Sequence, residues 1–391
     1  MQTWKFILLT ICTIPFVFTA CTPEDDEVIS GPGEAIVLEC RYDDDVTLID
    51  HNPDGVDYIV ECFVEVFGGT MVIEPGVTIV FEDDAGLDVE INGALNAVGT
   101  ADMPITMRGA TPGVASWRGI TFITSDVNNR LDYVNISDAG TTVNYALFDD
   151  PVAVGVVGTL SMNNTSITNS KVDGMLIYEE GAEILSFSNN TISNSGRYPI
   201  IIETGELSKM DLASCSFKDN GENVIAYEAR GNRLYGEHVW ADPGLPFRQL
   251  SEMQVWGDLS LEAGVEIEMV EGTSLTIVST IDEEYNLTIN GTADRPVVIR
   301  GKESFPGYWS GIEVNSNSVK NIFTNLVISD GGKEALTWSD LTGNIQVWGE
   351  NRLSLNAVVS SNAEGCDVVL MEHETVNFTA TDSDALNICE D

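Results

Sequence analysis

Residues 99–109 read GTADMPITMRG, and residues 291–301 read GTADRPVVIRG, so one motif occurs twice at a spacing of 192 residues. The same spacing aligns residues 117–120 (WRGI) with residues 309–312 (WSGI). A register that is held over this distance indicates a duplicated module rather than chance similarity. The chain is therefore expected to contain the same structural unit twice.

The alignment of the two copies shifts toward the N-terminus. Residues 74–77 (EPGV) align with residues 262–265 (EAGV) at a spacing of 188, and residues 55–58 align with residues 244–247 at 189. The four-residue difference belongs in a turn, which we expect around residues 281–285. The second module should therefore begin near residue 240.

A shorter period lies inside the first copy. Residues 161–170 read SMNNTSITNS, residues 186–195 read SFSNNTISNS, and residues 211–220 follow more loosely as DLASCSFKDN, each step being 25 residues. A unit of this size is too small to bury its own apolar face, so it must stack on its neighbours.

The 25-residue period also predicts which side chains lie above one another. We expect two inward apolar columns and one polar column at the bend between them, in which side chains hydrogen-bond along the stack. The columns are Met162, Phe187 and Leu212; Ile167, Ile192 and Phe217; and Thr165, Asn190 and Cys215. Short strands with period-two alternation are expected at residues 70–73, 77–81 and 87–91, with Asn92-Gly93 and Asn290-Gly291 as breaks between strands.

These features resemble the right-handed parallel β-helix of pectate-lyase-like proteins, and in particular secreted bacterial β-helix proteins with PGV-x-I and W-x-GI motifs. The resemblance implies an all-β solenoid built from two homologous modules and capped at both ends. Module 1 is expected at residues 45–239, and module 2 with a C-terminal cap at residues 240–391. Whether the modules form one rod or meet at a bend near residues 241–249 stays open.

The N-terminus is expected to be a targeting signal. Residues 1–5 carry one positive charge, and residues 6–18 form a nearly unbroken apolar run that is too short to span a bilayer comfortably. The segment 1–20 ends before Cys21 in the sequence FTAC. This ending resembles the lipobox of bacterial lipoproteins, which implies cleavage before Cys21, lipidation of Cys21 and an outer-membrane anchor. Residues 21–44 would form an acidic tether and the start of an N-terminal cap. An ordinary secretory signal with a chance cysteine is the alternative.

The acidic run directly behind Cys21, residues 24–27, resembles the surface-export signal of some Gram-negative lipoproteins, which implies exposure at the cell surface. A solvated tether is the other interpretation of this run. Across the chain, 62 Asp and Glu residues outnumber 18 Lys and Arg residues, for a formal net charge of -44. This charge argues against a nucleic-acid partner and disfavours unassisted binding of polyanions. Ca²⁺ is a candidate ligand for so acidic a surface, although no EF-hand loop marks a site.

The cysteines predict two disulfides in an exported protein. Cys40 and Cys62 flank the expected N-terminal cap, and Cys366 and Cys389 lie near the C-terminal end. Cys215 is left over and is expected to be a buried thiol. A zinc site is not expected, because there is no CxxC and the three histidines, His51, His238 and His373, are scattered.

Catalytic motifs are hard to find in this sequence. Asp149-Asp150 is the nearest acidic pair, but it precedes Pro151 in an expected turn, and the acidic runs 43–45 and 83–84 are expected to be solvated turns. Basic residues that a uronate lyase would need occur in the unique stretch of the first copy without a linking motif. They are Arg197, Lys209, Lys218, Arg230 and Arg233.

Aromatic residues give a binding role as a further hypothesis. Trp240, Trp256, Trp338 and Trp348 are candidates for platforms on which sugars stack, with burial in the core as the alternative, whereas the repeated Trp117 and Trp309 are expected to be structural. The first functional hypothesis is a non-catalytic surface lipoprotein that presents a rigid face for adhesion or glycan binding. The alternatives are a polysaccharide lyase or glycoside hydrolase with a divergent site, and a plain structural spacer.

Overall fold

The computed structural model describes residues 33–391, apart from residues 114, 147, 179, 180, 281, 337, 339, 373 and 384 and the side chain of Arg230. The expected signal segment 1–20, the expected lipidation site Cys21 and the residue His373 lie outside the described residues. No helix in the described part of the chain has the length and apolar character needed to cross a membrane.

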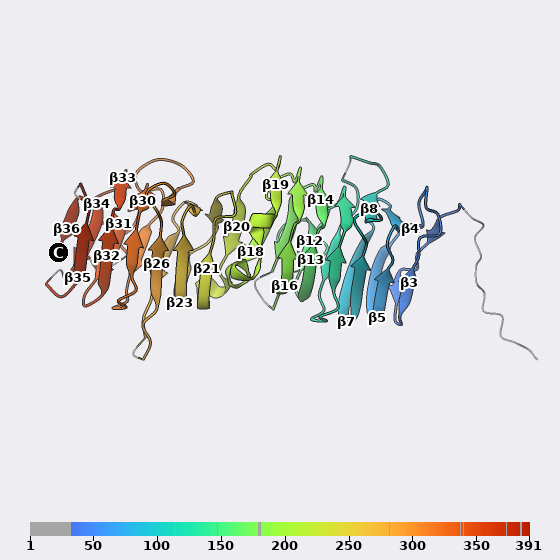
Figure 1. The fold of residues 1–391 in the computed structure, drawn as a ribbon, viewed down its shortest axis with the longest axis horizontal. Helices are drawn as coiled ribbons and strands as arrows, with labels where there is room; N and C mark the ends of the chain where they lie inside the picture. Colours follow the sequence, from blue (N-terminus) through green and yellow to red (C-terminus); the bar gives the residue numbers. More distant parts are fainter. Residues whose placement is uncertain are drawn as a thin grey trace, which may run out of the picture.

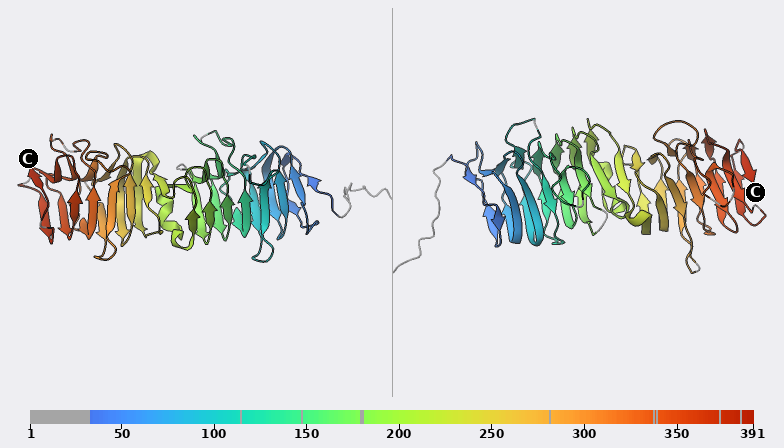
Figure 2. Two further views of the ribbon diagram at one scale, coloured as in Figure 1. Left: turned by 90° about the horizontal axis from the view of Figure 1, so that it is seen from above. Right: turned by 180° about the vertical axis from the view of Figure 1, so that it is seen from behind.

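The described chain is an elongated all-β body in which parallel strands lie side by side along the long axis (Figures 1 and 2). The first sheet has eight strands: β1 (Ile36–Val37), β4 (Tyr58–Val60), β6 (Thr78–Phe81), β8 (Ile105–Gly109), β11 (Val134–Ser137), β14 (Ser166–Thr168), β17 (Thr191–Ser193) and β19 (Ser216–Lys218). The interior between the sheets is filled by one continuous cluster of buried apolar side chains.

The second sheet has seventeen strands: β2 (Arg41–Tyr42), β3 (Val46–Leu48), β5 (Phe63–Ile73), β7 (Gly86–Val98), β9 (Ile120–Phe122), β10 (Arg130–Asp132), β12 (Val152–Val156), β13 (Thr159–Asn163), β15 (Asp173–Ile177), β16 (Glu183–Ser188), β18 (Ile200–Glu203), β20 (Ile225–Glu228), β22 (Phe247–Gln249), β24 (Glu266–Met269), β27 (Val297–Gly301), β30 (Leu326–Ser329) and β33 (Val359–Ser361). The long strands β5 and β7 each pair with two separate sets of strands, which joins those sets into one sheet.

The third sheet has eleven strands: β21 (Arg233–Trp240), β23 (Met253–Glu262), β25 (Ser274–Ile277), β26 (Asn286–Asn290), β28 (Gly311–Val314), β29 (Ile322–Thr324), β31 (Gly343–Trp348), β32 (Arg352–Asn356), β34 (Cys366–Met371), β35 (Asn377–Thr381) and β36 (Ile388–Glu390). Three short 3₁₀ helices, η1 (Thr204–Lys209), η2 (Leu212–Ser214) and η3 (Arg230–Asn232), lie before β21.

The columns predicted from the 25-residue period are present with one change. Ile167, Ile192 and Phe217 occupy the same register on β14, β17 and β19, and Met162 faces Phe187 across β13 and β16. The third residue expected in that column, Leu212, lies in η2 and not in a strand, although it is still buried. A 3₁₀ turn therefore replaces the strand of this coil while its apolar side chain keeps its place in the core.

The polar column hydrogen-bonds along the stack as expected. The Thr165 amide donates to Asn190 Oδ1 at 3.0 Å, and the Asn190 amide lies 3.4 Å from Cys215 Sγ. Cys215 is a free thiol, but it is half-buried rather than buried. Burial raises the pKa of this thiol, so Cys215 is a weak nucleophile at neutral pH.

Residues at the 192-residue spacing make equivalent contacts. The indole N–H of Trp117 donates to the Ser137 carbonyl at 2.8 Å, and that of Trp309 donates to the Ser329 carbonyl at 2.7 Å. Both indoles are fully buried. The two copies of the motif thus build the same local structure.

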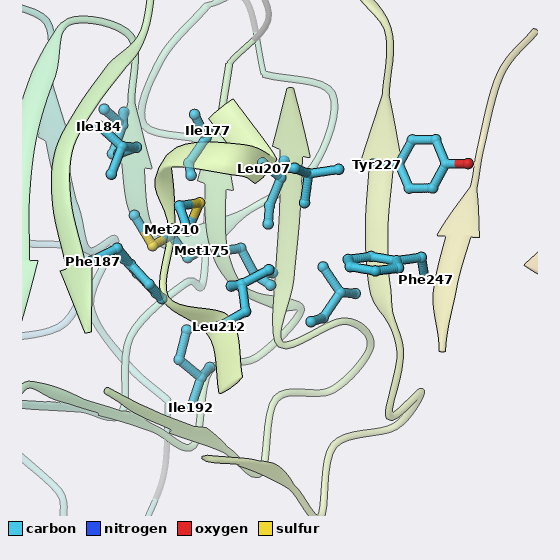
Figure 3. Packing of buried hydrophobic residues seen from close by; sticks show 14 of the residues in the cluster. Met175, Ile177, Ile184, Phe187, Ile192, Leu207, Met210, Leu212, Tyr227 and Phe247 are labelled. Atoms are coloured by element: carbon cyan, nitrogen blue, oxygen red, sulfur yellow. The ribbon is translucent and has the colours of Figure 1, made fainter. Parts of the chain in front are cut away.

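The two copies share one sheet without a break. Strand β20, at the end of the first copy, pairs with β22, and β22 pairs with β24. Between them, Leu207, Met210 and Leu212 from the 3₁₀ region lie among strand side chains such as Phe187 and Phe247 (Figure 3). The core and the second sheet therefore both run through the junction near residues 241–249.

One local prediction is wrong. Asn92-Gly93 was expected to separate two strands, but it lies inside β7, where a Cβ on Gly93 would come within 2.0 Å of the Val66 carbonyl oxygen. Glycine is required here for close approach of two backbones, not for a turn. Residues 36–48, part of the expected N-terminal cap, form the short strands β1, β2 and β3 at the end of the ladders.

Four of the described cysteines form two disulfides, which join neighbouring strands or the residues just before them. Cys40 is bonded to Cys62, and Cys366 is bonded to Cys389. The Cα–Cα distances are 5.8 Å in the first disulfide and 6.0 Å in the second. Each bond therefore links consecutive coils near one end of the described body.

A buried carboxyl on the outer face of the second sheet gives a pH-dependent prediction. Asp88 lies between Glu65 and Thr121 on adjacent strands, and burial, with the nearby Glu90 and Glu65 charges, raises its pKa to about 7. The folded state therefore keeps a proton that the unfolded chain releases near pH 4, and its stabilising effect is lost as the pH rises toward 7. Asp88→Asn should therefore raise the free energy of unfolding relative to the wild type at pH 8.5. This gain should be about 1–3 kcal/mol larger at pH 8.5 than at pH 5. Urea unfolding at both pH values measures the difference, and an equal difference at the two values would contradict it.

Candidate functional site

Trp240, one of the four tryptophans predicted to form sugar platforms, is buried. Its side chain is only 2% exposed and packs against Tyr227 and Phe247, with ring centroids 5.0 and 5.7 Å away. The interpretation of Trp240 as an exposed platform is wrong, because it occupies an inward position at the end of β21.

The other three tryptophans reach the surface at two separate places. Trp338 is 87% exposed and stacks on the half-buried Trp348, with centroids 6.1 Å apart. Trp256 is half-buried on the outer side of β23, beside Tyr235 and Tyr285. The structure therefore does not bring the predicted tryptophans together into one site.

The structure instead joins two groups that the sequence left apart, Asp149-Asp150 and Arg197, in a groove of about 470 Å³. The groove lies over the outer face of β12, β15, β18 and β20. Its lining residues are Phe148, Asp149, Asp150, Val152, Asp173, Leu176, Ile177, Tyr178, Arg197, Tyr198, Ile201, Ile202, Glu203, Glu228 and Leu250. This volume and this mixture of apolar and polar groups are typical of small-molecule sites.

The floor of the groove is apolar because outward positions of neighbouring strands carry aliphatic side chains. Leu176 on β15 and Ile201 on β18 are paired in register and both are half-buried. On β12, Gly155 pairs with Leu176, and a Cβ there would come within 2.3 Å of the Phe148 ring. Glycine at this position lets the loop before β12 fold down and place Phe148 against the sheet.

One wall is held by an ion-pair cluster. Arg197 Nη2 lies 2.7 Å from Asp150 Oδ2 and 2.5 Å from Asp173 Oδ2, and its Nε donates to Asp173 Oδ1 at 3.0 Å. Asp173 is fully buried and also accepts the Tyr198 amide at 3.0 Å. Hydrogen bonds to Asp173 and Asp150 raise the pKa of Arg197, so its charge is permanent. The cluster fastens the loop that carries Asp150 to β15.

The opposite wall carries a tyrosine and two glutamates. Tyr178 follows β15 and lies near Phe148, with centroids 6.1 Å apart. Glu203 and Glu228 occupy the same register on β18 and β20. Glu203 accepts the Gly205 amide at 2.8 Å and so caps η1.

The remaining basic candidates lie outside this groove. Lys209 pairs with Glu206 at 2.8 Å, Lys218 is exposed on β19, and Arg233 lies over the Trp256 ring. The side chain of Arg230 lies outside the described residues. In the described part of the chain, no group of three or more His, Cys, Asp or Glu side chains is arranged to hold a metal ion, so the Ca²⁺ expectation has no site there.

Comparison with known proteins identifies no relative: no family model, no curated protein and no solved structure matches this chain. The site therefore has to be interpreted from its own chemistry. An apolar floor, two tyrosines and fixed hydrogen-bonding groups on both walls suit a ligand with alternating apolar and hydroxyl-bearing faces.

Proposed function

We propose that this protein is a non-catalytic cell-surface lipoprotein that binds neutral oligosaccharides in the groove between Phe148 and Glu228. The observation that carries the proposal is the groove itself, with its apolar strip flanked by tyrosines and by carboxylates of fixed orientation. Sugar rings present apolar C–H faces to such a strip and hydroxyl donors to such carboxylates.

The charge of the groove favours a neutral ligand over an acidic one. The lining includes five carboxylates and a single cation, Arg197. The Arg197 guanidinium is already bonded to Asp150 and Asp173. A uronate would therefore meet net negative charge, on a chain whose formal charge is -44.

Binding is favoured over catalysis because most of the groove carboxylates have structural partners. Asp150 and Asp173 are paired with Arg197, and Glu203 caps a helix. A proton-transfer residue must instead be positioned toward the scissile bond.

One observation supports a glycoside hydrolase as the second candidate. Glu203 and Glu228 face the groove from adjacent parallel strands, which lie about 4.8 Å apart. Retaining glycosidases place two carboxyl groups about 5 Å apart. Release of reducing sugar from a neutral polysaccharide, abolished in Glu228→Gln, would establish this alternative.

The architecture that we propose is a right-handed parallel β-helix made of two homologous modules, residues 45–239 and 240–391. The parallel ladders, the in-register columns and the matching contacts of Trp117 and Trp309 support it. A rod of this kind would present the groove on a rigid outer face.

The groove proposal predicts a measurable loss of binding. Soluble neutral oligosaccharides, such as cello-, xylo-, manno- and laminari-oligosaccharides, are titrated by calorimetry against the wild type and Tyr178→Ala. Because Tyr178 lines one wall, its removal should weaken binding by about tenfold or more. Glu82→Gln, an exposed acidic position outside the groove, is the matched control and should bind like the wild type. Tighter binding of uronate oligomers than of neutral ones would contradict the proposed ligand class.

The proposed location is the outer membrane, facing outward, with the lipid on Cys21. Replacing Cys21 by serine should move the full-length protein from the membrane fraction to the soluble fraction, because the anchor is lost. Protease treatment of intact cells should degrade the wild type. Retention of Cys21→Ser in membranes would reject the lipid anchor.

A further inference from the structure

Three aromatic rings form a row on the outer face of the third sheet, on different strands from those that form the groove. Tyr235 on β21 and Trp256 on β23 are paired in register, and their ring centroids lie 6.2 Å apart. Tyr285 follows at 6.3 Å from Trp256. We call Tyr235, Trp256 and Tyr285 the aromatic row. Neighbouring strands succeed one another along the long axis of the body (Figure 1), so the step from Tyr235 on β21 to Trp256 on β23 follows that axis.

The rings of the row are held in place by specific contacts. The Arg233 guanidinium lies 4.6 Å from the centroid of Trp256 and donates to the Tyr235 hydroxyl at 3.1 Å. The Trp256 indole N–H donates to Gln254 Oε1 at 2.9 Å. The row is therefore pre-organised, which lowers the entropy cost of binding a ligand.

Tyr285 is present in the row because of the extra residues of the second copy. Ser279 and Glu284 form an antiparallel bridge that closes the turn, and the Tyr285 hydroxyl donates to Glu283. The four-residue insertion predicted around residues 281–285 therefore supplies the third ring. The second copy differs from the first at the place where it gains an aromatic surface.

The first copy has a simpler counterpart. Arg41 lies 3.8 Å from the centroid of the Phe67 ring, which is 41% exposed. Arg41 Nε donates to Asp43, whereas Arg233 bonds to a tyrosine. Arg41 and Phe67 thus give an internal reference with the same cation and a single ring.

The surroundings of the row define the ligand that it suits. Tyr235 is 58% exposed, so the row is open at this end. Glu237 and Glu283 add negative charge around the rings, whereas Asp258, which is paired in register with Glu237, is neutralised by Lys320 at 2.8 Å. An acidic polymer, or a second copy of this chain with its charge of -44, would be repelled. The carboxylates can accept hydrogen bonds from hydroxyl groups.

We propose that the aromatic row is a second binding surface, which takes an extended, uncharged polysaccharide lying along the axis of the protein. Successive sugar rings would stack on Tyr235, Trp256 and Tyr285 and donate hydroxyl hydrogen bonds to the flanking carboxylates. The surface is independent of the groove, since the two share no residue. The groove would take soluble fragments, and the row would hold the polymer.

Co-sedimentation with insoluble polysaccharides tests this surface directly. The purified full-length protein is mixed with microcrystalline cellulose, curdlan, chitin and insoluble xylan, and the bound fraction is measured against protein concentration. Wild type should bind at least one of these polymers. Tyr235→Ala and Trp256→Ala should each weaken that binding by about tenfold.

Controls separate a lost surface from a lost fold and from the groove. Phe67→Ala removes the reference ring, and Val239→Ala removes a 57% exposed side chain from the same strand as Tyr235, so both should bind like the wild type. Tyr178→Ala should keep polymer binding while losing soluble oligosaccharides. Tyr235→Ala changes a largely exposed side chain, so this variant should fold. It therefore tests the aromatic row even if the Trp256→Ala variant does not fold. Failure of the wild type to bind any of the four polymers, or unchanged binding by Tyr235→Ala, would overturn the proposal.

Discussion

Replacing Trp117 by alanine should lower the free energy of unfolding by about 3–5 kcal/mol, and replacing Trp309 by alanine should have a similar effect. Each indole is fully buried and donates a hydrogen bond to a main-chain carbonyl one coil away. Trp117 also stacks on Phe81, with centroids 3.9 Å apart, so its loss should be the larger of the two. Denaturant unfolding of the two variants, followed by circular dichroism, measures both values.

Hydrogen exchange on the same variants gives the location of the damage. In a stack where each coil contacts only its neighbours, Trp117→Ala should loosen β8 and β11 while β27 and β30 keep their protection, and Trp309→Ala should do the reverse. Trp338→Ala is the matched control, because that ring is 87% exposed and its removal should change stability by less than about 0.5 kcal/mol. A small effect at either Trp117 or Trp309 would contradict the equivalence of the two copies.

Replacing Arg197 by methionine should destabilise the protein by about 2–3 kcal/mol, because it leaves the Asp173 carboxylate buried without its cation. Complete burial of both partners would give a larger cost, but the Arg197 side chain is 37% exposed and water reduces the effect. The loop that carries Asp150 should also lose its attachment to β15, so binding in the groove should weaken. Urea unfolding at pH 7.5 and calorimetric titration measure the two effects.

A second substitution isolates the buried charge as the cause. Asp173→Asn combined with Arg197→Met removes both charges and should recover much of the lost stability. Arg41→Met is the control, since Arg41 also pairs with two carboxylates, Asp43 and Glu65, but all three side chains are 40% or more exposed. Its effect on the free energy of unfolding should be much smaller than that of Arg197→Met, because water screens an exposed ion pair. Equal losses for Arg41→Met and Arg197→Met would show that burial of Asp173 is not responsible.

The columns of the core were predictable because they depend on the 25-residue period. Stacking in register follows from repeated apolar side chains, and it places Ile167, Ile192 and Phe217 above one another. Leu212 lies in a 3₁₀ helix and not in a strand. The loose match of residues 211–220 to the repeat does not reveal this difference.

The groove was missed because its residues come from outside the recognised repeat blocks. The 25-residue step, continued past those blocks, relates Leu176 to Ile201 and Glu203 to Glu228, so the register of the floor and of one wall was present in the sequence. The contact of Arg197 with Asp150 could not be predicted from the sequence, because it depends on a loop that folds down over Gly155. Loop conformation is not encoded by a periodic pattern.

The sequence alone determined that this chain is all-β, that its strands recur at 25 residues and that one motif is built twice, because side-chain periodicity dictates which faces must be buried. Only the tertiary structure decided which surface residues meet. It placed Asp150 against Arg197, and it aligned Tyr235, Trp256 and Tyr285 across two strands and a turn. Burial is a local consequence of pattern, whereas the meeting of outward side chains depends on strand register and loop paths over the whole stack.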